Sequence, residues 1–138
     1  MWIDQTDYLW QVHPIITIDF SLMAVKSAEE LESGLIDFLQ NYAQRTRITL
    51  RSGPYYTQFS DLIYKLAAKG KVVILIDEYD KPLIDNLSHV EEAKNIRDVL
   101  KGFYTVIKAM DAQVRFVFLT GISKFRNENL ITFPFAAP

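Results

Sequence analysis

The chain has 138 residues, of which 49% are hydrophobic, and this length and composition predict one globular unit with a substantial core. Its 15 basic and 17 acidic residues leave a formal charge of -2, so the overall balance does not indicate a nucleic acid partner. There is no cysteine, which excludes disulfides, thiolate metal sites and cysteine nucleophiles.

The sequence contains no recognisable export or membrane signal. Its N-terminal MWIDQTDYLWQ is acidic and aromatic, and it lacks the basic and apolar regions of a signal peptide. No apolar run reaches the roughly 20 residues that cross a membrane. Together with the absence of cysteine, these features predict a soluble, cytoplasmic protein.

Three short segments have the pattern of buried parallel strands. They are PIITIDF at 14–20, VVILID at 72–77 and VRFVFLT at 114–120. Each is rich in β-branched or aromatic residues and nearly continuous in its apolarity, as expected for strands that are covered on both faces.

Amphipathic helical patterns lie between these strands. The first opens at Ser27, with Glu30 at capping-box spacing. The second runs from about Gln58 and stops at Gly70, a residue type that commonly follows a helix. The third begins at Ser88 and repeats the capping-box spacing to a glutamate.

The stretch from Arg45 to Tyr56 has mixed charge and a Gly53-Pro54 turn signal, so we expect a surface loop between the first two helices. The resulting order of strand, helices, strand, helix and strand is that of a doubly wound α/β fold. We expect no second domain.

Polar residues follow each predicted strand. They are Asp19 and Ser21, then Asp77, Glu78 and Asp80, then Thr120, Ser123 and Lys124. Parallel strands place their carboxyl ends on one edge of the sheet, where ligands of open α/β folds bind. This edge is the candidate site.

The adjacent acids Asp77 and Glu78 end the central apolar run. In a regular strand their side chains would point to opposite faces, which argues against a facing carboxylate pair of the glycosidase type. At a strand end they suit separate tasks, one near a magnesium ion and one near a water. An apolar run followed by Asp-Glu is the Walker B pattern of P-loop ATPases, although many buried strands also end in acids that cap the next turn.

Three longer blocks carry a family resemblance. ILIDEYDKP at 74–82 and FVFLTGISKF at 116–125, preceded by HPIITIDFS at 13–21, resemble the bacterial AAA-ATPase-like family. Its members are P-loop ATPase domains, often followed by a PD-(D/E)XK nuclease-like domain. The resemblance extends from about Ile3 to Phe125 and implies an ASCE-type P-loop fold, with residues 1–138 forming a single partial domain and a sheet of about three strands.

The resemblance also implies roles for four residues, with ATP and Mg²⁺ as cofactors. Asp77 would be the Walker B acid that holds the magnesium shell, and Glu78 would orient or activate the attacking water. Thr120 matches the sensor position that contacts the γ-phosphate or that water. Lys124 lies in the matching motif as a candidate nucleotide contact, with a solvated lysine or a helix-cap partner as the alternative.

The phosphate-binding loop of such ATPases is not found in the sequence. No stretch matches G-x-x-x-x-G-K-[ST], and Gly70-Lys71 is followed by Val72 and precedes a strand, so we interpret it as a helix stop. In the family, this loop and its strand precede the three blocks. We therefore expect an ATPase domain that lacks its first strand and phosphate-binding loop. We expect this chain alone to have no ATPase activity.

In the family the first strand lies beside the one that matches Val114–Thr120, so we expect this edge to be unpaired and to mediate self-association. The alternative function is a noncatalytic protein-interaction module built on a degenerate ATPase core. Such a module would bind a partner through the same edge or through Tyr55 and Tyr56. Nucleotide binding distinguishes the two functions.

Overall fold

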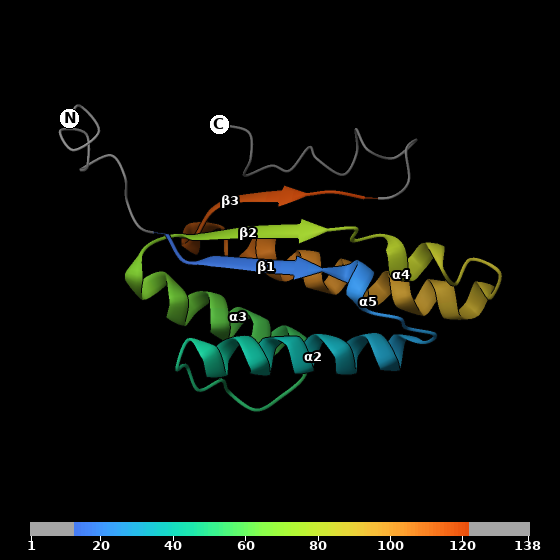
Figure 1. The fold of residues 1–138 in the computed structure, drawn as a ribbon, viewed down its shortest axis with the longest axis horizontal. Coiled ribbons are helices and arrows are strands. Elements are labelled where there is room, and N and C mark those ends of the chain that lie inside the picture. The colour runs from blue at the N-terminus through green and yellow to red at the C-terminus, as the bar shows by residue number, and fades with distance from the viewer. Residues whose placement is uncertain (1–12, 122–138) are drawn as a thin grey trace.

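The computed structural model describes residues 13–121 and contains one three-stranded parallel sheet (Figure 1). Its strands are β1 (Ile15–Asp19), β2 (Val72–Asp77) and β3 (Val114–Leu119), in the spatial order β1-β2-β3. All three predicted strands are confirmed, and the fold is α/β as expected. Each strand is β-branched or aromatic at most positions, which suits a pleated and largely buried backbone.

Four α-helices and three short 3-10 turns connect the strands. They are α2 (Ala28–Arg45), α3 (Tyr55–Leu66), α4 (Lys81–Ile84), α5 (Val90–Ala109), η2 (Phe20–Leu22), η3 (Ala67–Lys69) and η4 (Asp111–Gln113). In this described part of the chain, no helix has the length and apolarity needed to cross a membrane.

The start of α2 follows the predicted cap. Ser27 is the N-cap residue, and its side chain accepts a hydrogen bond from the Glu30 N–H at 3.1 Å. The Glu30 carboxylate turns back to the Lys26 N–H at 2.8 Å, one residue earlier than in a standard capping box. The first helix therefore begins where its sequence indicates.

The predicted starts of the other two long helices, α3 and α5, are wrong. Helix α3 begins at Tyr55, so Tyr55 and Tyr56 belong to the helix and not to a surface loop. Tyr55 is buried and its hydroxyl donates to the Val99 carbonyl at 3.0 Å, a tertiary contact that favours the longer helix. Helix α5 has His89 as its N-cap without a side-chain hydrogen bond, so Ser88 is not the cap.

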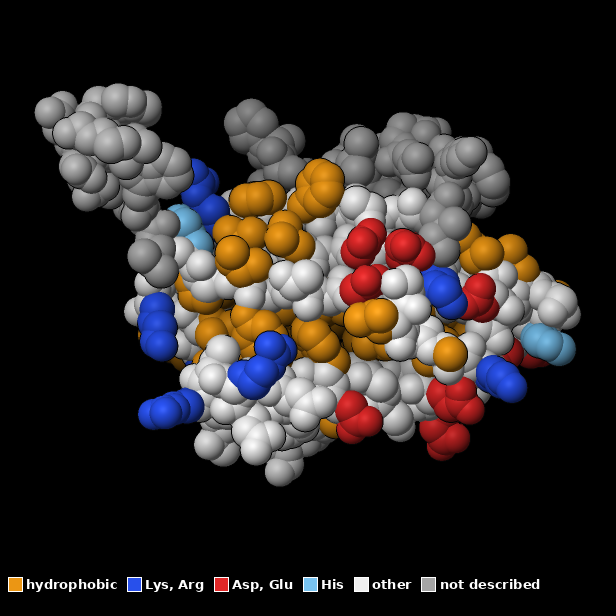
Figure 2. Space-filling model, viewed as in Figure 1, with side chains coloured by type: hydrophobic (Ala, Val, Ile, Leu, Met, Phe, Trp, Pro, Cys, Tyr) orange, Lys and Arg blue, Asp and Glu red, His pale blue; other side chains and the backbone are white. Residues whose placement is uncertain are grey.

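The sheet is covered on one face within the described residues. Helices α2, α3 and α5 lie together on one side of it, and the inward rows of the strands are buried there (Figure 1). On the other face, Ile15, Phe116 and Phe118 are exposed by 49%, 43% and 54%, and hydrophobic side chains spread over the strands (Figure 2). A doubly wound sheet has helices on both faces, whereas residues 13–121 supply one layer of helices.

Candidate functional site

The carboxyl ends of the three strands meet at one edge, as predicted. Asp19 and Asp77 are register partners on β1 and β2, and Ile76 is paired with Leu119 on β3. Thr120, the next residue after Leu119, therefore stands level with Asp77. Acidic side chains gather at this end of the sheet in Figure 2.

Thr120 ties the end of β3 to the loop after β2. Its hydroxyl donates a hydrogen bond to Asp77 Oδ1 at 2.5 Å and accepts one from the Glu78 N–H at 3.1 Å. Its carbonyl accepts the Tyr79 N–H at 3.1 Å, and its own N–H donates to the Ile76 carbonyl at 2.9 Å. The side chain and backbone of Thr120 thus hold four consecutive residues, Ile76 to Tyr79, in place.

Glu78 has a left-handed backbone, with φ of 51°. This conformation is uncommon for a residue with a side chain, because the Cβ atom crowds the neighbouring carbonyl oxygen. The strand ends at Asp77, so Glu78 is free of the strict alternation of strand side chains. Strained backbone held by surrounding hydrogen bonds is concentrated at functional sites, and Glu78 has this character.

Asp19 contributes a further negative charge to the edge. Its carboxylate accepts hydrogen bonds from the Ser21 hydroxyl at 2.6 Å and from the Ser21 N–H at 2.9 Å. These two bonds stabilise the charged form and lower the pKa of Asp19 below its ordinary value. The nearby cation Lys81 makes its ion pair with Asp85, one helical turn later.

Asp77 is the residue best suited to contact a magnesium ion at this edge. It is exposed, and within residues 13–121 only its Oδ1 takes part in a hydrogen bond. The same residues contain no group of three or more His, Cys, Asp or Glu suited to hold a metal ion by themselves. Since Mg²⁺ usually binds through one or two carboxylates together with substrate phosphates, the edge fits a metal that arrives with a nucleotide.

Among the predicted site residues, Asp77, Glu78 and Thr120 are brought together, and Lys124 lies outside the described residues. The bridge made by Thr120 and the left-handed Glu78 were not predicted. A hydroxyl residue directly after the third apolar run is the sequence signal that could have indicated the bridge, because parallel strands end side by side.

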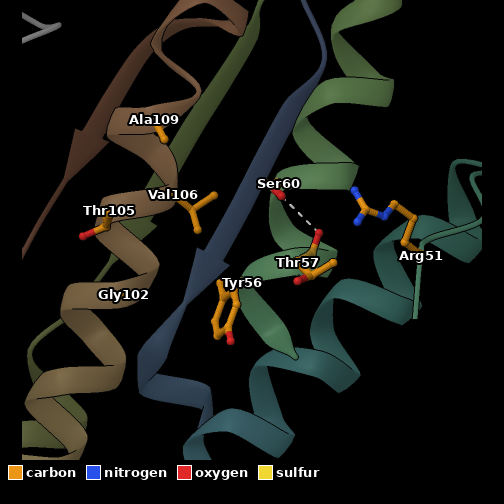
Figure 3. Close-up of a pocket in the computed structure, with 8 residues that line it drawn as sticks. All are labelled: Arg51, Tyr56, Thr57, Ser60, Gly102, Thr105, Val106 and Ala109. Carbon is orange, nitrogen blue, oxygen red and sulfur yellow. Dashed lines mark hydrogen bonds between the residues drawn. The ribbon is translucent and has the colours of Figure 1, made fainter. Parts of the chain in front are cut away.

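A separate hollow of about 460 Å³ lies between α3 and α5 (Figure 3). Arg51, Tyr56, Thr57 and Ser60 line one side of it, and the stretch 102–109 of α5 contributes to the other. Asp77, Glu78 and Thr120 do not line this hollow. The candidate site is therefore the open sheet edge and not the cavity between the helices.

Comparison with known proteins identifies the family. A family model described as Predicted AAA-ATPase matches residues 1–131, almost the whole chain. The chain belongs to the AAA-ATPase-like family. The resemblance carried by the three sequence blocks is thereby confirmed, and in this AAA-ATPase-like chain the described residues of the blocks lie within or next to β1, β2 and β3.

A curated relative is also similar to this AAA-ATPase-like chain. It is an uncharacterized protein in the vnfD 5′ region of Azotobacter chroococcum mcd 1, 39% identical over 122 residues. The match covers 87% of this chain and 24% of that relative, so the chain spans about a quarter of the relative's length. No solved structure gives a significant match.

Proposed function

We propose that the chain is the Walker B and sensor portion of an ATP-binding and ATP-hydrolysing domain. The observation that supports this most is the hydrogen-bonded unit at the sheet edge, in which Thr120 holds both Asp77 and Glu78. An acid that can contact Mg²⁺, a second acid and a polar residue at the end of the adjacent strand are the parts that phosphoryl transfer requires at this position.

In this proposal each residue has a separate task. Asp77 contacts the magnesium of a bound Mg-ATP, and that ion would neutralise charge on the phosphates. Glu78 orients or activates the attacking water. Thr120 orients the two acids through the hydrogen bonds described above, in addition to the sensor role implied by the family. Lys124 is a candidate nucleotide contact.

A phosphate-binding loop must come from elsewhere for this site to work. None of the 138 residues forms the glycine-rich motif whose N–H groups hold the phosphates. Without bound phosphates a single exposed carboxylate retains Mg²⁺ poorly, since this ion gives up its waters reluctantly. The chain alone therefore hydrolyses no ATP, and the loop is supplied by another segment of a longer polypeptide.

Phosphate release tests this proposal. The 138-residue chain should release no more phosphate from Mg-ATP than its Glu78→Gln variant. A version extended upstream in its own gene should hydrolyse ATP and lose roughly 10²–10⁴-fold in rate on the same substitution, the usual scale for a general base that acts on the reacting water. Activity of the chain alone above the Glu78→Gln control refutes the missing loop, and an extended version unaffected by the substitution refutes the role of Glu78.

The second candidate is a noncatalytic protein-interaction module in the cytoplasm, a location that the absence of cysteine favours. The sheet face that no described helix covers, with Ile15, Phe116 and Phe118 exposed, supports this alternative. Of the two adjacent tyrosines, Tyr55 is buried and only Tyr56 is available to a partner. Failure of both the chain and its extended version to bind nucleotide would favour this function.

We also propose that the isolated chain self-associates through Val114–Thr120. Strand β3 is an edge strand of the described sheet, and Arg115 is the one charged residue in that segment. Such an edge presents unpaired N–H and C=O groups to a second chain. Light scattering should show a mass that grows with concentration, and a monomer at high concentration would contradict this.

A further inference from the structure

Positive charge is concentrated at the amino end of the sheet, opposite to the candidate site. The segment 45–71 contains six Lys or Arg and one Asp, whereas the rest of the described chain has seven Lys or Arg and thirteen Asp or Glu. All six cations are exposed; they are Arg45, Arg47, Arg51, Lys65, Lys69 and Lys71, which together we term the basic pole. The net charge of -2 conceals this separation.

The fold brings these residues to one end of the molecule. The last turns of α2 and α3 and the first residue of β2 lie at the same end (Figure 1). The loop 46–54 leaves the end of α2 there and is hydrogen-bonded to α3. At the left of Figure 2 the visible charged side chains are Lys and Arg, whereas at the opposite end Asp and Glu predominate with some Lys or Arg among them. The charge separation is therefore spatial as well as sequential.

Hydrogen bonds hold the loop of the basic pole against α3. Lys65 Nζ donates to the Thr49 carbonyl at 2.7 Å, and the Arg51 N–H donates to Asp61 Oδ2 at 3.0 Å. Asp61 is buried and pairs with Lys65 at 3.0 Å. Asp61, the single acid of the segment, is thus occupied by its contacts with Lys65 and the Arg51 backbone. The arginine side chains lie exposed on the folded surface.

We infer that the basic pole binds the phosphodiester backbone of nucleic acid. Three of its six cations are arginines, whose planar guanidinium matches the geometry of a phosphate. Among the described ion pairs, Lys65 alone of the six cations has an acidic partner, and the Arg45 guanidinium lies 5.3 Å from the ring centroid of Tyr42. At least four cations are consequently available to phosphates.

The surroundings favour nucleic acid over a protein partner. The large hydrophobic side chains exposed within the segment 45–71 are Tyr56 and Tyr64, and both are aromatic. A protein interface needs a desolvated apolar centre, whereas a nucleic acid interface is polar and positive and uses aromatic rings for stacking on bases. The basic pole is positively charged and carries exposed aromatic rings, so its composition is that of a nucleic acid interface.

Fluorescence anisotropy with a labelled 20-base-pair duplex and a single strand of equal length tests this inference. The 138-residue chain should bind with a dissociation constant on the order of 10⁻⁴ M or tighter at 50 mM KCl, and binding should weaken as salt rises. The triple variant Arg47→Gln, Lys69→Gln, Lys71→Gln should bind at least about tenfold more weakly and reduce the log–log salt slope for the duplex by about three.

The matched control is Lys94→Gln, Arg97→Gln, Lys101→Gln on α5, which removes the same charge from another surface. It should change the affinity by less than about threefold if the position of the charges, and not the total charge, determines binding.

Equal losses of affinity from both triple variants, no salt-dependent binding, or competition by polyglutamate as effective as that by the unlabelled duplex would overturn the inference. Preference for one of the two probes identifies the form of nucleic acid. Should the first triple fail to fold, the double variant Lys69→Gln, Lys71→Gln serves the same comparison.

Discussion

Thr120 and Asp77, separated by 43 residues in the sequence, are joined by a side-chain hydrogen bond of 2.5 Å at the edge of the sheet. The same hydroxyl accepts the N–H of Glu78 at 3.1 Å. One small residue directly after β3 therefore fixes two acids at the end of β2, Asp77 and Glu78, and this relationship can be tested apart from any catalytic activity.

Replacing Thr120 by Val should destabilise the chain by about 1–2 kcal/mol, because the Asp77 carboxylate and the Glu78 N–H lose a partner at nearly constant side-chain volume. Thr120→Ser keeps the hydroxyl and should lose clearly less. Urea denaturation at neutral pH measures both variants. A loss from Thr120→Val no larger than that from Thr120→Ser would contradict the dominant role of the hydroxyl at this position.

Replacing Glu78 by Gly should stabilise the chain by about 0.5–1 kcal/mol, since glycine adopts the left-handed conformation without a Cβ penalty. Glu78→Ala keeps the Cβ atom and should show no such gain. Thermal unfolding of the two variants provides the comparison. A gain from removing Glu78 would fit a residue retained for activity at the expense of stability, and a loss in both variants would argue against backbone strain.

The effects on stability of substitutions at Gly102 and Tyr55 should be coupled. A Cβ atom at Gly102 would lie 2.2 Å from the Tyr55 hydroxyl oxygen, so Gly102→Ala should cost about 1–3 kcal/mol. In a Tyr55→Phe background the nearest ring carbon would be 3.4 Å away, and the same change should become neutral or stabilising by up to about 1 kcal/mol, since it lies in helix α5. A double-mutant cycle measures this reversal, and additive effects would exclude the clash.

Asp61 should make stability depend on pH. Burial raises the pKa of Asp61, but the hydrogen bonds and positive charges of Lys65 and Arg51 outweigh this and hold that pKa below its ordinary value of 3.8. A carboxyl whose pKa is lowered by folding stabilises the protein above its unfolded pKa, and this contribution is lost as the pH falls through the folded pKa.

Asp61→Asn should therefore lower stability by about 1–2 kcal/mol at pH 7, through loss of the charge-assisted bond to Lys65. The difference between variant and parent should shrink as the pH is reduced below about 4. Melting temperatures of the variant and the parent at pH 7 and pH 3 measure this difference. A constant difference across this range would show that the charge of Asp61 contributes nothing.

The strands and the site edge could be predicted from the sequence because both depend on local apolarity and on parallel topology. The runs at 72–77 and 114–119 are apolar at nearly every position, and parallel strands must end at a common edge. The start of α3 could not be predicted in this way, because Tyr55 is drawn into the helix by a contact with Val99, 44 residues away.

A hydroxyl after the third apolar run could have indicated the bridge made by Thr120, but the choice of Asp77 as its partner depends on a register shift that could not be predicted from the sequence. Val72 is paired with Val114, but Val73 is paired with Phe116, so β3 has one extra residue at this point. Without this shift Thr120 would stand opposite Glu78 and not level with Asp77. A change of one residue in register thus decides which acid the hydroxyl contacts.

Titration of ATP in the presence and absence of Mg²⁺ tests the central claim most directly. The claim is that Asp77 contacts the magnesium of a nucleotide held by a loop outside this chain. The version extended upstream in its own gene should bind Mg-ATP, and Asp77→Asn should weaken that binding at least about tenfold while leaving magnesium-free binding unchanged. The 138-residue chain should bind neither form. Mg-ATP binding that is equally strong with and without Asp77, or no nucleotide binding by the extended version, would contradict the account.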